Sequence, residues 1–414
     1  MFPREIEKKI ECYFACRQAI FILGARQVGK TSLLKRIMER FPKNQIYYFD
    51  LERIADKNIL EKGVNNFLNY LQFNGMDLSK MNYIFIDEIH YLDDFSSFIK
   101  VLVDHHSDSI KLFLSGSSTT QIKIKFKDSL AGRKYVFHLF PLTFKEFLVF
   151  KGKSLIADKL NKRFYECDSD ELLFVREELI RLLNEFIIFG GYPEVAKINQ
   201  ISHKIEYLKD IVNSYIIKDI RTMFTIPNIN KFNHLIRFLA VNFTNLFAVE
   251  PTSREVKLTR ETVENYLNIL QDTFIIKLLS PYHKNKSTEL KKANKVFFLD
   301  NGIRNSLIEN FNPVEIRTDA GCLLENLIFS QVYKNLSEIG SLYYWRTTKK
   351  QEIDFILKRA EKLIPIEVKK AKLRKNHLKI FLNEYKCNKG YIVSLKDEYN
   401  KTQNIITLPA YLAN

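Results

Sequence analysis

The sequence contains few cysteines, and their spacing is not that of a metal site or a disulfide framework. Its five cysteines are an odd number, none forms a CxxC pair, and the eight histidines show no ligand spacing. These absences argue against a structural zinc site and against a disulfide-stabilised secreted fold.

Long apolar segments are also missing. The longest candidate, residues 235–249, is interrupted by Arg237, Asn242 and Asn245, and the first eight residues carry too much charge for a signal peptide. The chain has no low-complexity tract and no repeat of fixed period. We therefore expect a soluble, cytoplasmic protein of about two to four domains that has no membrane partner.

Apolar runs alternate with helical patterns over residues 1–150. The runs lie at residues 19–23, 46–49, 83–86 and 111–114, with helix-like stretches at 30–40 and 95–103. Short apolar strands that alternate with helices predict an α/β fold with a parallel sheet covered by helices on both faces. Over residues 151–250 the apolar spacing changes to three or four residues, which predicts a helical region.

Two further parts are predicted behind this helical region. In residues 251–285, Thr259 can cap a helix and a β-rich stretch follows, as in a winged helix, although an ordinary helical packing module is an alternative. Residues 286–414 have the predicted order α-β-β-β-α-β, which indicates a compact mixed domain. The predicted parts are therefore residues 1–150, 151–250, 251–285 and 286–414.

Residues 24–31 (GARQVGKT) match the phosphate-binding pattern GxxxxGK[ST] directly after a predicted strand. Glycines let backbone N–H groups turn towards phosphate oxygens, Lys30 reaches the β- and γ-phosphates, and the Thr31 hydroxyl ligates Mg²⁺. The pattern therefore predicts a site for ATP and Mg²⁺. The predicted nucleotide-binding residues of this loop are Gly24, Ala25, Arg26, Gln27, Val28, Gly29, Lys30, Thr31 and Ser32.

Acidic and polar residues follow the next predicted strands. Asp87 and Glu88 end an apolar strand, where Asp87 is predicted to hold Mg²⁺ and Glu88 to orient or deprotonate the attacking water. Ser117, in a serine-rich turn, is predicted to touch the γ-phosphate or that water. Arg133 is a candidate for neutralising transition-state charge in its own or a neighbouring subunit, and an ordinary surface role is equally compatible with its basic surroundings.

These motifs together resemble a large family of prokaryotic AAA-type ATPases. The resemblance extends over nearly the whole chain, and its further motifs are residues 115–117 (SGS), 130–133 (LAGR), 141–147 (PLTFKEF), 190–194 (GGYPE), 215–219 (YIIKD), 297–302 (FFLDNG), 324–326 (LEN), 344–346 (YWR), 352–355 (EIDF) and 366–369 (IEVK). In that family a winged-helix segment and a C-terminal domain of unassigned function follow the ATPase domain. The resemblance implies ATP binding and slow hydrolysis, with Lys30 and Glu88 as catalytic residues.

Acidic residues and a lysine recur on neighbouring elements of the tail. Alternation along a strand places Glu367 and Lys369 on one face, and Asp354 points away from its apolar neighbours on the preceding strand. With Glu325 on the helix before them, these residues resemble the PD-(D/E)XK nuclease pattern, except that Ile353 stands where that pattern has proline.

This second resemblance implies a particular set of roles. Glu325, Asp354 and Glu367 would hold Mg²⁺ or Mn²⁺, and Asp354, Glu367 and Lys369 would be catalytic, with the lysine steering water. A surface ion pair on a hairpin and a nuclease-like domain that only binds are the alternatives.

Positive charge points to a polyanionic partner. The formal net charge is +16, and residues 341–380 contain 12 Lys or Arg against 4 Asp or Glu. We expect a nucleic-acid partner, with DNA favoured over RNA, and an oligomer is compatible with the sequence. Two functions remain open: an ATPase whose nuclease-like tail acts on nucleic acid, and an ATP-dependent switch whose non-catalytic tail binds DNA or protein.

Overall fold

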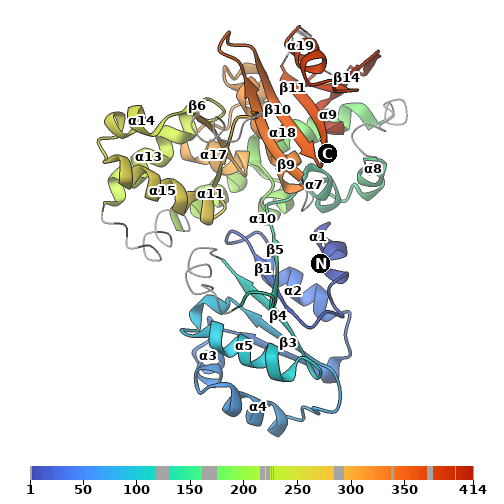
Figure 1. Cartoon of the computed structure of the whole chain (residues 1–414), viewed down its shortest axis with the longest axis vertical. Coiled ribbons are helices and arrows are strands. Elements are labelled where there is room, and N and C mark those ends of the chain that lie inside the picture. The colour runs from blue at the N-terminus through green and yellow to red at the C-terminus, as the bar shows by residue number, and fades with distance from the viewer. Residues whose placement is uncertain are drawn as a thin grey trace. The chain divides into compact units, whose positions relative to one another are not determined.

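The computed structural model describes residues 2–117, 130–160, 175–214, 220, 224, 226, 228–283, 293–336, 340–370, 376–396 and 398–413 (Figure 1). The chain divides into two compact units, one formed by Met1–Phe140 with Asp272–Phe274 and the other by Pro141–Gln271 with Ile275–Asn414. None of the helices in the described part of the chain combines the length and the apolar character needed to cross a lipid bilayer.

A five-stranded parallel sheet forms the centre of the first unit, in the order β2-β3-β4-β1-β5. Its strands are β1 (Ala19–Leu23), β2 (Ile46–Asp50), β3 (Asn82–Asp87), β4 (Ile110–Gly116) and β5 (Lys134–His138). The four predicted apolar runs become β1 to β4. Strand β5 was not predicted because no residue of this edge strand is fully buried, so it lacks a continuous apolar run.

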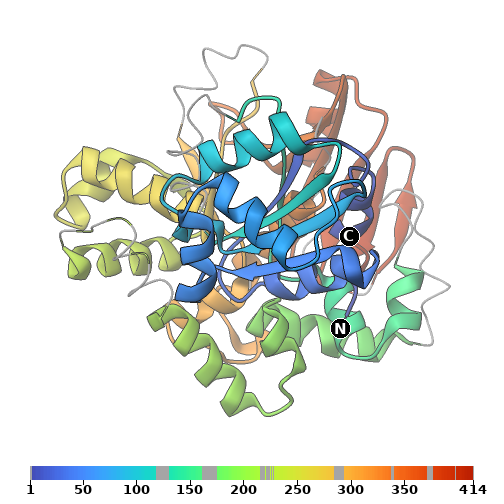
Figure 2. The ribbon, with the colours of Figure 1, turned by 90° about the horizontal axis from the view of Figure 1, so that it is seen from below.

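Helices cover both faces of this sheet, as predicted. They are α1 (Ile6–Glu11), α2 (Lys30–Met38), α3 (Ile54–Glu61), α4 (Val64–Phe73) and α5 (Phe95–His106). Parallel crossovers are right-handed, so α2 lies on one face and α3, α4 and α5 lie together on the other (Figure 2). The carboxyl ends of β1, β3 and β4 therefore meet at one edge of the sheet, where the chain supplies its polar residues.

The second unit starts with helices. They are α7 (Phe144–Phe150), α8 (Ser154–Lys159), α9 (Arg176–Phe189), α10 (Pro193–Lys197) and α11 (Ile201–Ile211). The predicted first domain, residues 1–150, extends beyond the first unit because α7 packs on α8, α9 and α10. Residues 161–174 of the predicted helical region and the YIIKD motif at 215–219 lie outside the described residues.

A small sheet with three helices follows in the order α13 (Ile229–Val241), β6 (Leu246–Phe247), α14 (Val249–Glu255), α15 (Arg260–Asp272), β7 (Ile276–Leu279) and β8 (Asn294–Phe298). The antiparallel strand order β6-β8-β7 gives this segment a winged-helix topology. Thr259 caps α15 as predicted, because its Oγ1 accepts the Thr262 N–H at 3.2 Å. The predicted segment, residues 251–285, contains α15 and β7 but neither α13 nor β8, and residues 284–285 lie outside the described ones.

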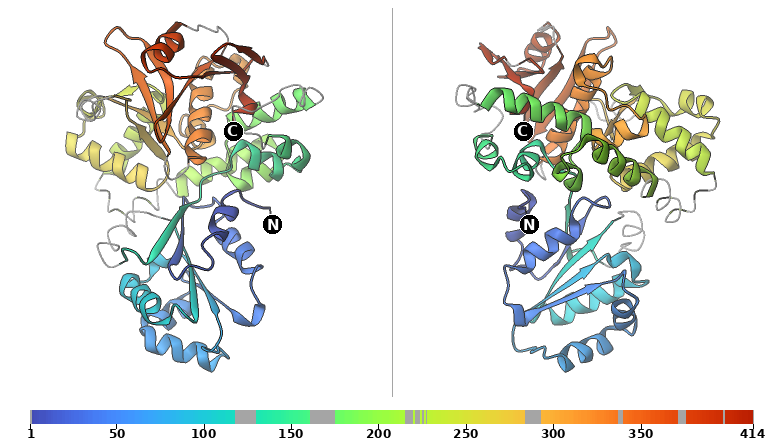
Figure 3. Two further views of the ribbon diagram at one scale, coloured as in Figure 1. Left: turned by 45° about the vertical axis from the view of Figure 1, so that its right-hand side comes forward. Right: turned by 180° about the vertical axis from the view of Figure 1, so that it is seen from behind.

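The tail forms a mixed sheet in the order β13-β14-β12-β11-β10-β9 (Figure 3). Its elements are α17 (Asn301–Leu307), α18 (Ala320–Lys334), β9 (Gly340–Arg346), β10 (Glu352–Arg359), β11 (Lys362–Lys369), α19 (Asn376–Glu384), β12 (Gly390–Ser394), β13 (Asn400–Thr402) and β14 (Ile405–Pro409). From α18 to β12 the order is the predicted α-β-β-β-α-β. The two further strands β13 and β14 extend the sheet.

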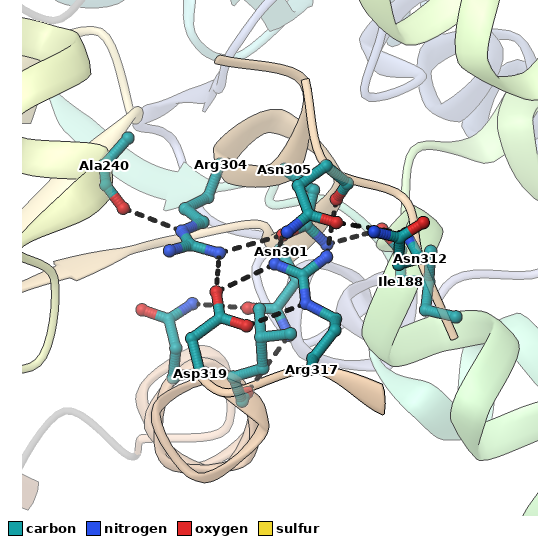
Figure 4. Close-up of polar contacts among 11 residues, drawn as sticks. Ile188, Ala240, Asn301, Arg304, Asn305, Asn312, Arg317 and Asp319 are labelled. Carbon is teal, nitrogen blue, oxygen red and sulfur yellow. Dashed lines mark hydrogen bonds and ion pairs between the residues drawn. The ribbon is translucent and has the colours of Figure 1, made fainter. Parts of the chain in front are cut away.

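Buried polar side chains join α17 to three other helices of this unit (Figure 4). Arg304 Nε donates to the carbonyl oxygen of Ala240 in α13 at 2.7 Å, and Asn305 Nδ2 donates to that of Ile188 in α9 at 2.8 Å. Asp319, just before α18, accepts from Arg304 at 2.5 Å and from Arg317 at 2.8 Å. These contacts make the helical region and the tail sheet parts of one unit.

Two glycine motifs of the sequence meet at Asp300. Its side chain accepts hydrogen bonds from the N–H of Gly191 at 2.7 Å and of Ile303 at 3.1 Å, and the second contact caps α17. A Cβ on Gly302 would overlap the carbonyl oxygen of Phe189. The GGYPE and FFLDNG motifs are therefore two sides of one backbone contact between α9 and α17.

We predict that the same substitution has opposite effects at two helical glycines of this unit. Gly302→Ala should lower the free energy of unfolding by about 1–3 kcal/mol, since its methyl group has no space against Phe189. Gly321→Ala should raise it by up to about 1 kcal/mol, because nothing lies within 4 Å of its Cβ position and alanine favours the helix. Urea unfolding followed by circular dichroism measures both, and equal stabilities of the two variants would contradict the packing argument.

Candidate functional site

The phosphate-binding pattern forms the loop between β1 and α2. Gly29 has a φ of 95°, in the left-handed region that favours glycine, and a Cβ on Gly24 would overlap the carbonyl oxygen of Leu139. Arg4, which the sequence analysis did not single out, donates from Nη1 to the carbonyl oxygen of Val28 at 2.9 Å. The glycines and this hydrogen bond fix the path of the loop ahead of Lys30, the first residue of α2.

Three hydroxyl groups converge on the buried carboxylate of Asp87 at the end of β3. Thr31 donates to Asp87 Oδ2 at 2.6 Å and Tyr48 at 3.1 Å, while Ser115 donates to Oδ1. Thr31 and Asp87, the predicted magnesium ligands of this site, are thus brought together, and their oxygens are the donor type that Mg²⁺ requires. Burial and the nearby Asp87 raise the pKa of Tyr48, so its hydroxyl stays protonated and donates.

Tyr48 and Ser115 were not predicted as site residues. Ser115 also accepts the backbone N–H of Glu88 at 3.0 Å, so it positions both acidic residues of the strand end. The sequence could have indicated Ser115, because it lies near the carboxyl end of a predicted strand and the carboxyl ends of neighbouring parallel strands lie side by side. Tyr48 lies inside β2, where the sequence pattern gives no such signal.

Lys30, Glu88 and His90 form a buried chain of charged and polar groups. Lys30 Nζ lies 3.2 Å from Glu88 Oε1, and Glu88 Oε2 lies 3.2 Å from His90 Nδ1. Burial alone raises the pKa of Glu88, but attraction to Lys30 and His90 outweighs it and lowers the pKa to about 2. Glu88 also has a φ of 52°, a left-handed conformation that is uncommon for residues other than glycine. The predicted water-orienting carboxylate is therefore ionised and paired with Lys30.

Ser117 and Arg133 lie at opposite ends of the sheet. Ser117 follows Gly116, whose carbonyl oxygen accepts the N–H of Gly24, and its buried Oγ has no hydrogen-bond partner among the described residues. Arg133 precedes β5 beside Ala19 at the amino end of β1, and its Nε donates to Asp104 at 2.6 Å. Five strand residues at about 3.3 Å each separate Arg133 from the loop, so it lies at the opposite end of β1 from Lys30.

The predicted residues of the tail also gather on one face of their sheet. Strands β10 and β11 are antiparallel neighbours, and Phe355 pairs with Ile366, so Asp354 lies opposite Glu367. Asp354 Oδ2 accepts the N–H of Val368 at 2.7 Å, and Lys369 Nζ lies 2.5 Å from Glu367 Oε1 and 4.0 Å from Asp354 Oδ2. A register shift in β10 between Ile353 and Ile356 marks a bulge over Asp354 and Phe355, a feature that can re-aim a side chain.

Three residues that were not predicted as site residues, Lys295, Arg346 and Glu352, join this group. Lys295 in β8 is buried, and its Nζ lies 3.1 Å from Glu325 and 2.6 Å from Glu352. Glu352 also pairs with Arg346 at 3.2 Å. We call Lys295, Glu325, Arg346, Glu352, Asp354, Glu367 and Lys369 the carboxylate–lysine cluster.

The predicted metal set of Glu325, Asp354 and Glu367 is not assembled in this cluster. Nowhere among the described residues are three Asp, Glu, His or Cys side chains placed so that they could share a metal ion. The reason is that lysine ammonium groups pair with the carboxylates, Lys295 with Glu325 and Lys369 with Glu367. The sequence could not show Lys295, because it belongs to a distant strand.

Burial and repulsion between the carboxylates hold protons in the cluster. Burial is the largest cause, and the nearby charge of Asp354 adds to it, so that the pKa of Glu325 and that of Glu367 each rise to about 8. Burial likewise raises the pKa of Asp354. Lysine attraction opposes these shifts without cancelling them.

Three family models match successive parts of the chain. Residues 16–148 match an AAA domain, residues 180–314 a domain of unknown function (DUF8612), and residues 320–412 a second domain of unknown function (DUF4143). The first match contains the loop, Asp87, Glu88, Ser117 and Arg133. The carboxylate–lysine cluster draws Lys295 from the second match and its other members from the third.

Two proteins of similar sequence are described as uncharacterised. One from Methanocaldococcus jannaschii is 27% identical, over 85% of this chain and 75% of its own length. Another from Haemophilus influenzae is 24% identical, over 84% and 81%. Solved structures with a partial likeness include the Aeropyrum pernix ORC1 protein in complex with DNA (14% identity, 75% of this chain and 93% of that chain, TM-score 0.32) and AMPPCP-bound DnaA from Aquifex aeolicus (16%, 64% and 86%, TM-score 0.25).

The raised pKa values predict that the second unit loses stability as the pH rises. Between about pH 4.5, where an unfolded glutamate titrates, and pH 8, the folded state binds more protons than the unfolded state at Glu325 and Glu367, so the free energy of unfolding falls with pH. Glu325→Gln and Glu367→Gln should each reduce this decline. Between pH 6 and 9 the unfolding midpoint of each variant should fall by several degrees less than that of wild type. Thermal unfolding at stepped pH measures it, with Glu361→Gln at the exposed β10–β11 turn as a control. Parallel curves for all four proteins would show that these carboxyls do not carry the linkage.

Proposed function

Since the first unit of this chain is an AAA-type P-loop ATPase domain, we propose that the protein binds Mg²⁺–ATP and hydrolyses it. The observation that supports this most directly is the meeting of Thr31, Asp87 and Ser115 at the strand ends beside Lys30. In this proposal residues 24–32 surround the phosphates, and Thr31 and Asp87 hold the metal ion. When bound there, the ion would neutralise negative charge on the phosphates.

Nucleotide binding is then an exchange of partners at Lys30. A γ-phosphate offers the ammonium group of Lys30 a new anion, and Glu88 loses the charge that lowers its pKa. The released carboxylate can accept a hydrogen bond from water, and His90 remains beside its Oε2. Ser117, whose buried hydroxyl has no partner among the described residues, is proposed to hydrogen-bond the γ-phosphate or that water.

Arg133 is proposed to serve a neighbouring subunit. Its place at the amino end of β1, away from the loop, supports a role towards a second copy more than a role in its own chain. Its partner Asp104 on α5 is itself partly exposed, so the guanidinium lies at a surface that a second copy can reach. The proposal therefore includes an oligomeric active state.

We predict that Glu88→Gln separates ATP binding from turnover. The amide keeps the shape but cannot deprotonate or strongly orient water, so ATP turnover should fall about 10²-fold or more. Binding should be unchanged or tighter, because the ion pair that competes with phosphate for Lys30 is removed. Lys30→Ala should instead weaken ATP binding by at least about tenfold.

Isothermal titration with a slowly hydrolysed ATP analogue and a phosphate-release assay provide the two measurements. Normal turnover in Glu88→Gln would remove Glu88 from the water-orienting role. Equal ATP affinity in Lys30→Ala would refute the site itself.

A second candidate function, nucleic-acid binding by the tail, rests on where its exposed basic residues lie. Lys349 and Lys350 are exposed in the β9–β10 turn, at the end of the sheet that carries Asp354 and Lys369. In contrast, the exposed face of α15 carries Glu261 and Glu264, the latter paired with Arg260 at 2.8 Å. Phosphate attraction therefore favours the tail over the winged helix as the contact surface, with DNA favoured over RNA. Cleavage of nucleic acid would require the carboxylate–lysine cluster to act as a nuclease site. An ATP-dependent switch would require only that the tail binds nucleic acid.

We predict that one charge reversal near the cluster weakens DNA binding and a matched one does not. Lys349→Glu should lower affinity several-fold and reduce the slope of log K against log salt concentration by about 1, as for one lost phosphate contact. Lys362→Glu is the control, because Lys362 is exposed at the start of β11, beside the opposite end of β10. Fluorescence anisotropy of labelled DNA and RNA over a salt series measures both. If the two variants behave alike, the surface at the cluster is not the binding face.

A further inference from the structure

Lys295 enters the carboxylate–lysine cluster from a part of the chain that the sequence pattern left out. It lies in β8 of the winged-helix segment, whereas Glu325 is on α18 and the remaining members are on β9, β10 and β11. The Lys295 side chain is 4% exposed, and its Nζ lies between Glu325 Oε1 at 3.1 Å and Glu352 Oε1 at 2.6 Å. A buried ammonium group at these distances from two carboxylates is a fixed positive charge.

The charges around Lys295 explain why it stays ionised. Burial alone would lower its pKa, but Glu325, Asp354 and Glu352 all lie near enough to raise it above its usual value. Lys369 plays the same part on the other side, between Glu367 and Asp354. Each carboxylate of the predicted metal set therefore already has an ammonium group as its partner.

The balance of charges shows what Lys295 replaces. Four carboxyl groups of the cluster face three cationic side chains, Lys295, Arg346 and Lys369. If all four carboxyl groups are ionised and Lys295 is removed, only Arg346 and Lys369 remain to balance them. Two surplus negative charges are then left, which is the charge that one divalent cation neutralises. In addition, Glu367 Oε2 is buried with no hydrogen-bond partner among the described residues, so one ligand atom is left over.

We propose that the carboxylate–lysine cluster is a metal-independent site in which the ammonium group of Lys295 takes the place of a divalent cation. The residues do not fit a metal while Lys295 lies among them, because its charge repels a second cation and its contacts occupy Glu325 and Glu352. The tail sheet thus keeps the carboxylate arrangement that resembles a nuclease but supplies the positive charge from its own chain. This proposal is independent of ATP hydrolysis in the first unit.

Manganese binding to the full-length, nucleotide-free protein at pH 8 tests the proposal. Electron paramagnetic resonance of free Mn²⁺ is recorded for wild type, Lys295→Met, Lys295→Arg, Glu325→Gln and the double variant Lys295→Met/Glu325→Gln. Wild type and Lys295→Arg should show no site tighter than roughly 1 mM that depends on Glu325. Lys295→Met should gain one Mn²⁺ site that depends on Glu325 and is at least about tenfold tighter than this 1 mM limit. The double variant should lack that site.

Two results would overturn the proposal. The first is a Mn²⁺ site in wild type that Glu325→Gln abolishes, because Lys295 would then yield to the metal. The second is a folded Lys295→Met protein, judged by circular dichroism, that gains no site. Mn²⁺ that binds at the P-loop also binds in Glu325→Gln, so the signal of that variant is subtracted from the signal of each other protein. If Lys295→Met does not fold, wild type compared with Glu325→Gln still shows whether the cluster binds Mn²⁺.

Discussion

An ion that leaves water has to be paired, and this constraint organises both functional regions of the protein. Lys30 is almost fully buried and faces Glu88, Lys295 is almost fully buried and faces Glu325 and Glu352, and Lys369 faces Glu367. The same rule explains the helix network, where Arg304 and Arg317 share the carboxylate of Asp319. In each case the charge of a buried side chain is neutralised by an oppositely charged side chain of the same protein.

The consequence differs between the two sites. At the P-loop the pairing partner is the carboxylate that is proposed to handle water, so a phosphate that takes Lys30 also releases Glu88. In the proposed function, nucleotide binding and activation of the water-orienting carboxylate are therefore coupled through the ion pair of Lys30 and Glu88. In the tail cluster the ammonium group of Lys295 is held by two carboxylates, and its side chain is buried in β8. The ion pair of Lys30 is therefore suited to an exchange of partners, whereas the contacts of Lys295 are suited to a fixed charge.

Motifs that stand out in a sequence need not belong to a ligand site. The GGYPE and FFLDNG motifs meet at Asp300, where backbone approaches backbone and only glycine fits. Asn326 of the LEN motif hydrogen-bonds both the N–H and the carbonyl oxygen of Phe298, at 2.8 and 2.9 Å. These residues join α9, α17, α18 and β8, which makes the helical region and the tail one packed unit. Their role is to place β8, and with it Lys295, against the tail sheet.

The sequence alone determined what depends on local pattern: four of the five parallel strands, the phosphate-binding loop, Asp87 at a strand end, the Thr259 cap and the order α-β-β-β-α-β of the tail. It also placed Asp354, Glu367 and Lys369 on one face, because strand alternation is a local rule. Only the tertiary structure showed that Ser115 and Tyr48 share Asp87, that Arg133 lies at the far end of its strand from the loop, and that Lys295 joins Glu325. Those facts depend on which strands become neighbours and in which register, and burial of charge is settled by contacts between residues far apart in the chain.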